Sequence, residues 1–212
     1  MTDTVLNPAI LNRDYVLLVD KSGSMSTPDV DGKSRWDAIK EASVAVARKL
    51  DEIDPDGIVF GLFSGTPQRF PNAKPDKIER LFKEQEPGGS TALHLALAAE
   101  LDDYLQRKAQ GKTHANGEAI FVVTDGAPDN REKVAQVIVN TTKRLTSPNE
   151  LNITFIQVGK DSAATEFLNR LDDDLEKEGA KYDIVDTITL EAMGSKPFTQ
   201  VLIDAVTEHK QH

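Results

Sequence analysis

The chain has 212 residues, of which 39% are apolar, a formal charge of −10 at pH 7 and no cysteine. This length and composition allow one fairly large domain with a hydrophobic core. The negative charge argues against nucleic acid and anionic membrane surfaces as partners, because both would repel the chain, and the lack of cysteine excludes disulfides, thiolate metal sites and cysteine nucleophiles.

Short apolar runs alternate with longer amphipathic segments along the whole chain. In chain order, the periodicity predicts a strand over 15–20, a helix over 36–50, a strand over 58–64, a short polar strand near 68–70, helices over 76–83 and 91–107, a strand over 119–124, a helix over 131–145, a strand over 153–158, a helix over 163–175, a strand over 183–186 and a helix over 198–209. Trp36 is expected to anchor the first of these helices in the core.

Two of the predicted strands, VLLV at 16–19 and IFVV at 120–123, are apolar at every position. Such strands suit a sheet that is covered on both faces, and hence parallel strands joined by helical crossovers. We therefore predict an α/β fold, a doubly wound and mostly parallel sheet with helices on both faces. With no linker or repeat in the sequence, we expect a single domain over 1–212, with an N-terminal arm over 1–12 and a core over 13–207.

Small oxygen-bearing side chains follow the first predicted strand at alternating positions in DKSGS, namely Asp20, Ser22 and Ser24. An extended or looping backbone can aim residues two apart toward one point. Comparable stretches are PGGSTAL, which contains Thr91 and leads into a helix, and VVTDGAP, which contains Asp125 and leaves a strand. Loops at the carboxyl ends of such strands converge, so these five side chains predict an all-oxygen site for a hard divalent cation such as Mg²⁺.

Each stretch also has a simpler interpretation. The Ser-Gly-Ser segment and the Thr-Asp-Gly segment could be ordinary turns, and Ser90 or Thr91 could be the N-cap of the next helix. His94, one helical turn beyond Thr91, could approach the rim of the site or simply pack. Asp29, Asp31 and Gly32 look like part of a calcium loop without its glutamate, and a polar turn is expected there. The order of the three stretches together favours the metal site.

Taken together, the DKSGS, Thr91 and Asp125 elements resemble the metal-ion-dependent adhesion site of von Willebrand factor A domains, over roughly residues 12 to 207. The resemblance implies a six-stranded sheet with one antiparallel edge strand and Mg²⁺ at its top, with Mn²⁺ or Ca²⁺ as other possibilities. It also implies that Ser22 and Ser24 are direct ligands. By the same resemblance, Thr91 and Asp125 bind directly or through water, and Asp20 binds mainly through water.

A magnesium ion held by hydroxyls, water and few carboxylates keeps a coordination position for a carboxylate from another protein. We therefore expect a divalent-metal-dependent protein-binding module, not an enzyme, whose partner offers an Asp or a Glu. One alternative is a magnesium-dependent phosphohydrolase or phosphotransferase of the haloacid dehalogenase type. Such an enzyme would place an acid where this chain has Ser22, which cannot act as a general acid near neutral pH. A scaffold domain that binds no metal is a further alternative.

The chain shows no signal peptide and no apolar run long enough for a membrane span, so we expect a cytoplasmic protein. Among family members, the stand-alone bacterial type is the most similar, which implies a partner in a stress-response or ATPase-linked complex. In regulated relatives, a shift of the last helix accompanies a change at the metal. The corresponding segment here is 198–209, for which a closing role in the fold is the simpler expectation.

Overall fold

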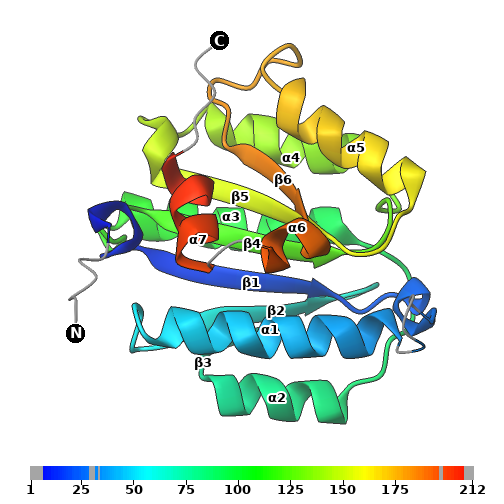
Figure 1. The fold of residues 1–212 in the computed structure, drawn as a ribbon. Helices are drawn as coiled ribbons and strands as arrows, with labels where there is room; N and C mark the ends of the chain where they lie inside the picture. The colour runs from blue at the N-terminus through cyan, green and yellow to red at the C-terminus, as the bar shows by residue number, and fades with distance from the viewer. Residues whose placement is uncertain (1–6, 29–31, 33, 196–197, 208–212) are drawn as a thin grey trace.

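The computed structural model in Figure 1 describes residues 7–28, 32, 34–195 and 198–207. Its described residues form a six-stranded sheet in the order β3-β2-β1-β4-β5-β6. The strands are β1 (Asp14–Asp20), β2 (Ile58–Phe63), β3 (Gln68–Ala73), β4 (Glu118–Thr124), β5 (Leu151–Gln157) and β6 (Val185–Thr189). Only the pairing of β2 with β3 is antiparallel among these strands. The predicted α/β fold class is confirmed.

Helices cover both faces of the sheet. The α-helices are α1 (Arg35–Asp51), α2 (Pro75–Glu84), α3 (Leu93–Ala109), α4 (Arg131–Thr142), α5 (Ser162–Asp173), α6 (Leu190–Gly194) and α7 (Phe198–Thr207), and the 3-10 helices are η1 (Pro8–Ile10), η2 (Gly23–Ser26) and η3 (Pro148–Glu150). One hydrophobic cluster joins the sheet to α1, α2, α6 and α7, and a second joins it to α3, α4 and α5.

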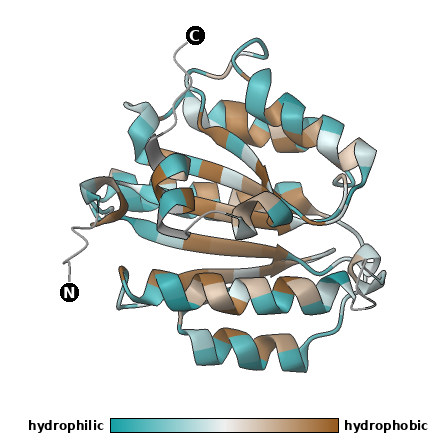
Figure 2. Ribbon diagram, in the orientation of Figure 1, coloured by the Kyte–Doolittle hydropathy of each residue, from teal (hydrophilic) through white to brown (hydrophobic). Residues whose placement is uncertain are grey.

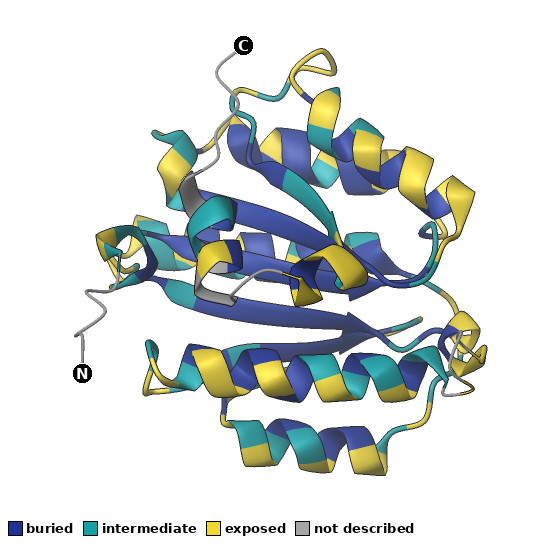
Figure 3. Ribbon diagram, viewed as in Figure 1, coloured by how far each residue is buried: buried dark blue, intermediate teal, exposed yellow. Residues whose placement is uncertain are grey.

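The central strand β1 explains why both faces need helices. Its alternate side chains Tyr15, Leu17 and Val19 lie in the first cluster, while Val16 and Leu18 lie in the second. All of them are nearly inaccessible to solvent, because period-two alternation sends apolar side chains to both faces. The central strands are accordingly mostly apolar in Figure 2 and buried in Figure 3, whereas the outer faces of the helices are polar and exposed.

The one antiparallel strand lies at an edge of the sheet and is short and polar. Residues 64–67 between β2 and β3 are enough for a hairpin but not for a helical crossover, so β3 must return antiparallel. Gln68 and Arg69 are exposed, and Pro71 fits an edge strand because it cannot donate a ladder hydrogen bond. Trp36 is buried and packs on Phe82, with ring centroids 4.8 Å apart, as predicted.

Several predicted boundaries differ from the structure. The last strand spans Val185–Thr189 and not 183–186, because pairing with β5 starts at Val185 and continues through polar, half-buried positions. Helix α3 begins at Leu93, after Thr91, and α4 ends at Thr142. The short helix α6 was not predicted, since five residues are too few to show a helical period. Helix α7 is described to Thr207, and residues 208–209 of the predicted helix lie outside the described residues.

The described part of the expected N-terminal arm packs against the core. Asn7 caps η1, Ile10 is 1% exposed within the first hydrophobic cluster, and the Tyr15 hydroxyl donates a 2.7 Å hydrogen bond to the Ile10 carbonyl. Residues 1–6 lie outside the described residues. None of the helices in the described part of the chain is long and apolar enough to cross a membrane.

Candidate metal centre

Three loops meet where β1, β2 and β4 end. The Lys21 amide donates to the Phe63 carbonyl at 2.8 Å, so the loop after β1 continues beside the end of β2. Two further backbone hydrogen bonds, Gly23 N to Gly89 O at 3.1 Å and Gly88 N to Lys21 O at 2.7 Å, join this loop to the one that precedes α3. The DKSGS and GGST segments are therefore held side by side at the carboxyl edge of the sheet, where ligands of such folds bind.

Asp20, the last residue of β1, forms the inner wall of this edge. It is 0% exposed, and its two carboxylate oxygens accept hydrogen bonds from the Ser22 amide and from the Thr124 hydroxyl, both at 2.7 Å. Burial raises the pKa of Asp20 to about 6, although the hydrogen bonds from Ser22 and Thr124 oppose the rise and the charge of Asp125 adds to it. Asp20 thus orients its neighbours from beneath the surface.

The other predicted residues that follow β1 and β4 are linked by a chain of short hydrogen bonds. The Ser22 and Ser24 hydroxyl oxygens are 3.0 Å apart, and the Ser24 hydroxyl donates to Asp125 Oδ1 at 2.8 Å. Because Ser24 has one proton and gives it to Asp125, the Ser22 hydroxyl must donate to Ser24. The second Asp125 oxygen, Oδ2, accepts a 2.7 Å bond from Arg35 Nη1. Asp20, Ser22, Ser24 and Asp125 are therefore brought together.

The backbone after Asp20 is extended at Ser22 and then forms a 3-10 turn, which is the looping form of the predicted backbone. Ser22 is the N-cap of η2 but makes no side-chain capping bond, and Ser24 lies inside this 3-10 helix. The tight helix brings the two hydroxyls together, with Ser22 buried and Ser24 exposed. The Ser-Gly-Ser segment is thus a turn, and its hydroxyls bond to each other and to Asp125 instead of capping the helix.

Thr91 stands on the neighbouring loop. The N-cap of α3 is Ala92, so the alternative in which Ser90 or Thr91 caps this helix is wrong. The backbone of Thr91 is instead clamped by Asp129, whose Oδ2 accepts from the Thr91 amide at 3.0 Å and whose amide donates to the Thr91 carbonyl at 3.1 Å. Within the described ranges, no hydrogen bond joins the half-buried Thr91 hydroxyl to the other four residues.

Three residues of this site were not identified from the sequence. Thr124 and Asp129 flank Asp125 in the TDGAPD segment and act through Asp20 and Thr91. Arg35 is the first residue of α1, where a positive charge is unfavourable because it lies at the positive end of the helix dipole. This unfavourable charge is the one feature of the sequence that could have pointed to Arg35. His94 makes no hydrogen bond to the site among the described residues, and its Nδ1 is buried without a partner there. Residues 29–31 lie outside the described part.

The donor set fits a hard divalent cation better than a transition metal. No group of three or more His, Cys, Asp or Glu side chains in the described part of the chain could hold a metal. The site instead offers the Ser22 and Ser24 hydroxyls and the Asp125 carboxylate, and the buried Asp20 carboxylate is hydrogen-bonded to the Ser22 amide. Oxygen donors with few carboxylates suit magnesium, which keeps several of its waters.

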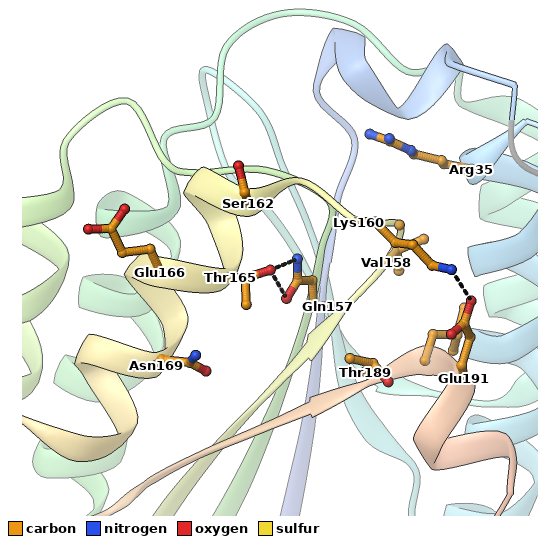
Figure 4. A pocket seen from close by; sticks show the side chains of 12 residues that line it. Arg35, Gln157, Val158, Lys160, Ser162, Thr165, Glu166, Asn169, Thr189 and Glu191 are labelled. Carbon is orange, nitrogen blue, oxygen red and sulfur yellow. Dashed lines mark hydrogen bonds and ion pairs between the residues drawn. The ribbon is translucent and has the colours of Figure 1, made fainter.

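A cavity of about 790 Å³ lies beside this edge, at the ends of β5 and β6. Figure 4 shows Gln157 and Thr165 hydrogen-bonded to each other on the α5 side, at 2.8 Å and 3.1 Å. Lys160 and Glu191 form a weak, exposed ion pair at 3.9 Å, and Arg35 reaches the cavity from the start of α1. Arg35 therefore lines the cavity and also contacts Asp125.

Comparison with known proteins gives a family and a set of fold relatives. The sequence model of the von Willebrand factor type A domain matches residues 14–195. No curated protein matches the chain. Similar solved structures include proximal thread matrix protein 1 from the mussel byssus, which is 18% identical with a TM-score of 0.59, over 92% of this chain and 48% of that one.

Two bacterial pilus proteins are also similar. A mutant of the PilB minor pilin from Streptococcus sanguinis is 14% identical with a TM-score of 0.60, over 92% of this chain and 60% of that one. The vWF domain of the type V pili tip protein Mfa5 from Porphyromonas gingivalis is 12% identical with a TM-score of 0.53, over 95% and 98% of the two chains. The chain thus spans 48–60% of the first two relatives, and at these identities the likeness shows the fold alone.

Proposed function

The chain belongs to the von Willebrand factor type A family, and we propose that it is a protein-binding module whose affinity depends on a divalent cation, in the first place Mg²⁺. The proposed ligands are Asp20, Ser22, Ser24, Thr91 and Asp125. The observation that carries the proposal is the hydrogen-bonded chain from Ser22 through Ser24 to Asp125 at the carboxyl edge of the sheet. Domains of this family are typically interaction modules, and a pilus adhesin, SpaC from Lactobacillus rhamnosus GG, is a further similar structure.

The residues of the site divide the work of binding. The exposed Ser24 hydroxyl and the buried Ser22 hydroxyl present lone pairs, and Asp125 supplies a nearby negative charge. Asp20 stays buried and acts through water and through the backbone of Ser22. A bound divalent ion would supply an electrophilic coordination position for an outside carboxylate. We propose that the partner offers an Asp or Glu side chain at this position.

The alternative of a phosphotransferase requires Asp20 to be an accessible nucleophile. Asp20 is 0% exposed, and both of its oxygens are occupied by the Ser22 amide and the Thr124 hydroxyl. Nothing in the comparisons supports that alternative. A scaffold role without metal is separated from our proposal by a direct measurement of metal binding.

The setting of the domain is a further proposal that rests on the sequence. We propose a stand-alone bacterial protein that works in the cytoplasm, with a partner from a stress-response or ATPase-linked complex. The structural relatives from pili come from a different setting, and their likeness concerns the fold. Neither nucleic acid nor a membrane is proposed as a partner, because the charge of −10 opposes both.

The test begins with metal binding, measured by titration calorimetry of the chain with Mg²⁺ and with Mn²⁺. We expect binding to the wild-type chain and to Ser26→Ala, and loss of binding in Ser24→Ala. Ser26 is the matched control because it is an exposed serine in the same 3-10 helix. A wild-type chain that binds neither ion would overturn the proposal in favour of the scaffold alternative.

Partner capture is the second step. The immobilised chain is incubated with an extract in Mg²⁺ or in EDTA, and proteins retained only in Mg²⁺ are compared with those retained by Ser24→Ala. We expect a protein that binds wild type and Ser26→Ala in Mg²⁺ and that is released by EDTA. Equal retention by wild type and Ser24→Ala would show that capture does not use this site.

A further inference from the structure

Arg35 occupies a position that the helix itself does not favour. It is the first residue of α1, directly after the N-cap Ser34, whose hydroxyl accepts from the Asp37 amide in a capping box. The positive end of the helix dipole lies here, so an acidic residue such as Asp37 is stabilised and a cation is not. A basic residue at this place requires compensation from elsewhere in the fold.

The compensation comes from Asp125. Arg35 Nη1 lies 2.7 Å from Asp125 Oδ2, and the Asp125 side chain is 0% exposed while that of Arg35 is 21% exposed. A buried carboxylate without a neighbouring cation is costly, because burial removes its hydration. Arg35 therefore neutralises the same carboxylate that the proposed metal would use.

The rest of the Arg35 guanidinium packs closely against the backbone of Gly159. The Arg35 Nε is buried without a hydrogen-bond partner among the described residues. The guanidinium bonds to the site through Nη1, which donates to Asp125. Gly159, with φ +74°, lets the guanidinium approach the backbone closely, since a Cβ on Gly159 would lie only 3.1 Å from Arg35 Nε. Arg35 also lines the cavity at the ends of β5 and β6, which offers space for the guanidinium (Figure 4).

We propose that Arg35 is a built-in counter-cation of the metal centre. It pairs with Asp125 while the site holds no divalent ion, competes with that ion for the carboxylate, and turns toward the cavity when the ion binds. This inference rests on the proposed metal-dependent function. It makes Arg35 a residue that sets the affinity of the site for its metal, and so the metal concentration at which a partner can be captured.

The test compares Arg35→Gln with the wild-type chain. Arg48→Gln is the matched control, because Arg48 is an exposed arginine on the same helix and its replacement changes the net charge equally. Mn²⁺ alone is titrated into each protein by calorimetry. We expect Arg35→Gln to bind Mn²⁺ about tenfold more tightly than wild type, the factor that corresponds to one charge-assisted hydrogen bond. Arg48→Gln should match wild type.

A second readout is the unfolding temperature, which can be measured in EDTA without any bound metal. In EDTA, Arg35→Gln should unfold at a lower temperature than wild type, because Asp125 then lacks its cation, and saturating Mn²⁺ should remove this difference. Arg35→Lys, which keeps the charge, should stay close to wild type in EDTA and remains usable where the glutamine variant does not fold without metal. Its Mn²⁺ affinity should lie between those of wild type and Arg35→Gln.

The outcomes separate the inference from the proposed function. Wild type that binds Mn²⁺ with the same or a higher affinity than Arg35→Gln overturns the counter-cation and leaves the metal centre standing. Binding by Arg35→Gln but not by wild type supports the inference in its strongest form. The absence of Mn²⁺ binding in every variant overturns both.

Discussion

Asp125 is a buried residue of the site, and both of its carboxylate oxygens are occupied. It is 1% exposed and bonded to Ser24 and Arg35. A residue with both oxygens occupied contributes to the stability of the metal-free protein as well as to binding. Its removal therefore has two consequences that can be measured separately.

We predict that Asp125→Asn lowers the free energy of unfolding in EDTA by about 1–3 kcal/mol, since the Arg35 guanidinium loses a charged partner, and lowers Mn²⁺ affinity by more than about tenfold. Chemical denaturation and calorimetry measure the two effects. Asp161→Asn is the control, because it removes the same charge from an exposed N-cap where asparagine caps equally well. Unchanged Mn²⁺ affinity in Asp125→Asn would remove this residue from the site.

Asp129 acts on the site through the backbone of Thr91. We predict that Asp129→Ala weakens Mn²⁺ binding severalfold, because Thr91 loses the acceptor that fixes its amide. Asp129→Asn keeps a side-chain oxygen at that place and should restore wild-type binding. Calorimetry of both variants shows whether Asp129 acts by its hydrogen bond to Thr91 or by its negative charge. An equal loss of Mn²⁺ affinity in the two variants would mean that the charge matters and the hydrogen bond does not.

At the scale of elements, the amino ends of β1 and β4 hold a second cluster of charges, built around one buried carboxylate. Glu118, the first residue of β4, pairs with Arg107 of α3, which also bonds to Asp14 and Asp103. Glu118 is 1% exposed, and its Oε1 has no hydrogen-bond partner among the described residues. Burial therefore outweighs the attraction of Arg107 and raises the pKa of Glu118 to about 7.

This pKa predicts the pH dependence of stability. The folded state holds the Glu118 proton more tightly than the unfolded chain does. Proton binding by Glu118 therefore stabilises the fold fully below about pH 4.5, and this stabilisation is lost as the pH rises to about 7. We predict that Glu118→Gln reduces this decline by about 1–3 kcal/mol. Urea unfolding at several pH values between 4.5 and 8 measures it, with the exposed Glu176→Gln as control. A wild-type slope that persists in Glu118→Gln would assign the decline to other groups.

The elements that could be predicted from the sequence are those with a strong period. The apolar strands 16–19 and 120–123 and the helix that begins near Trp36 were found because packing on both faces of a sheet imposes the pattern. Element ends were less predictable, since the start of α3 at Leu93 depends on the clamp between Thr91 and Asp129 from a distant loop. The contact of Arg35 with Asp125 joins residues ninety positions apart. The local sequence shows nothing of it except a positive charge at the start of a helix, where such a charge is unfavourable.

For the whole molecule, the parallel topology explains why the site could be predicted before its geometry was known. Strands β1 and β4 are neighbours in parallel register, from Asp14 with Glu118 to Val19 with Val123. Asp20, which ends β1, and Asp125, which follows β4, must therefore lie at the same edge. The order of the sheet thus determines that the two loops meet, while η2 and Arg35 determine how their side chains are arranged.

The last helix, α7, closes the first hydrophobic cluster far along the sheet from the metal centre. Val201 and Ala205 are 3% and 4% exposed within that cluster, and both line a cavity of about 190 Å³ beside β6, together with residues of β5. The helix thus has a small apolar interface and free space next to it. Those features would allow movement, but the main packing partners of α7 among the described helices and strands are η1, β5 and α6.

We therefore predict that α7 stabilises the fold without controlling the metal. Val201→Ala should lower the free energy of unfolding by about 1–3 kcal/mol, since a buried side chain is shortened in an already imperfect packing, and should leave Mn²⁺ affinity within about twofold of wild type. Leu95→Ala, an exposed apolar position on α3, is the control for stability. Because coupling between two sites is reciprocal, a change of about tenfold in Mn²⁺ affinity would show instead that the position of α7 and the metal centre are linked.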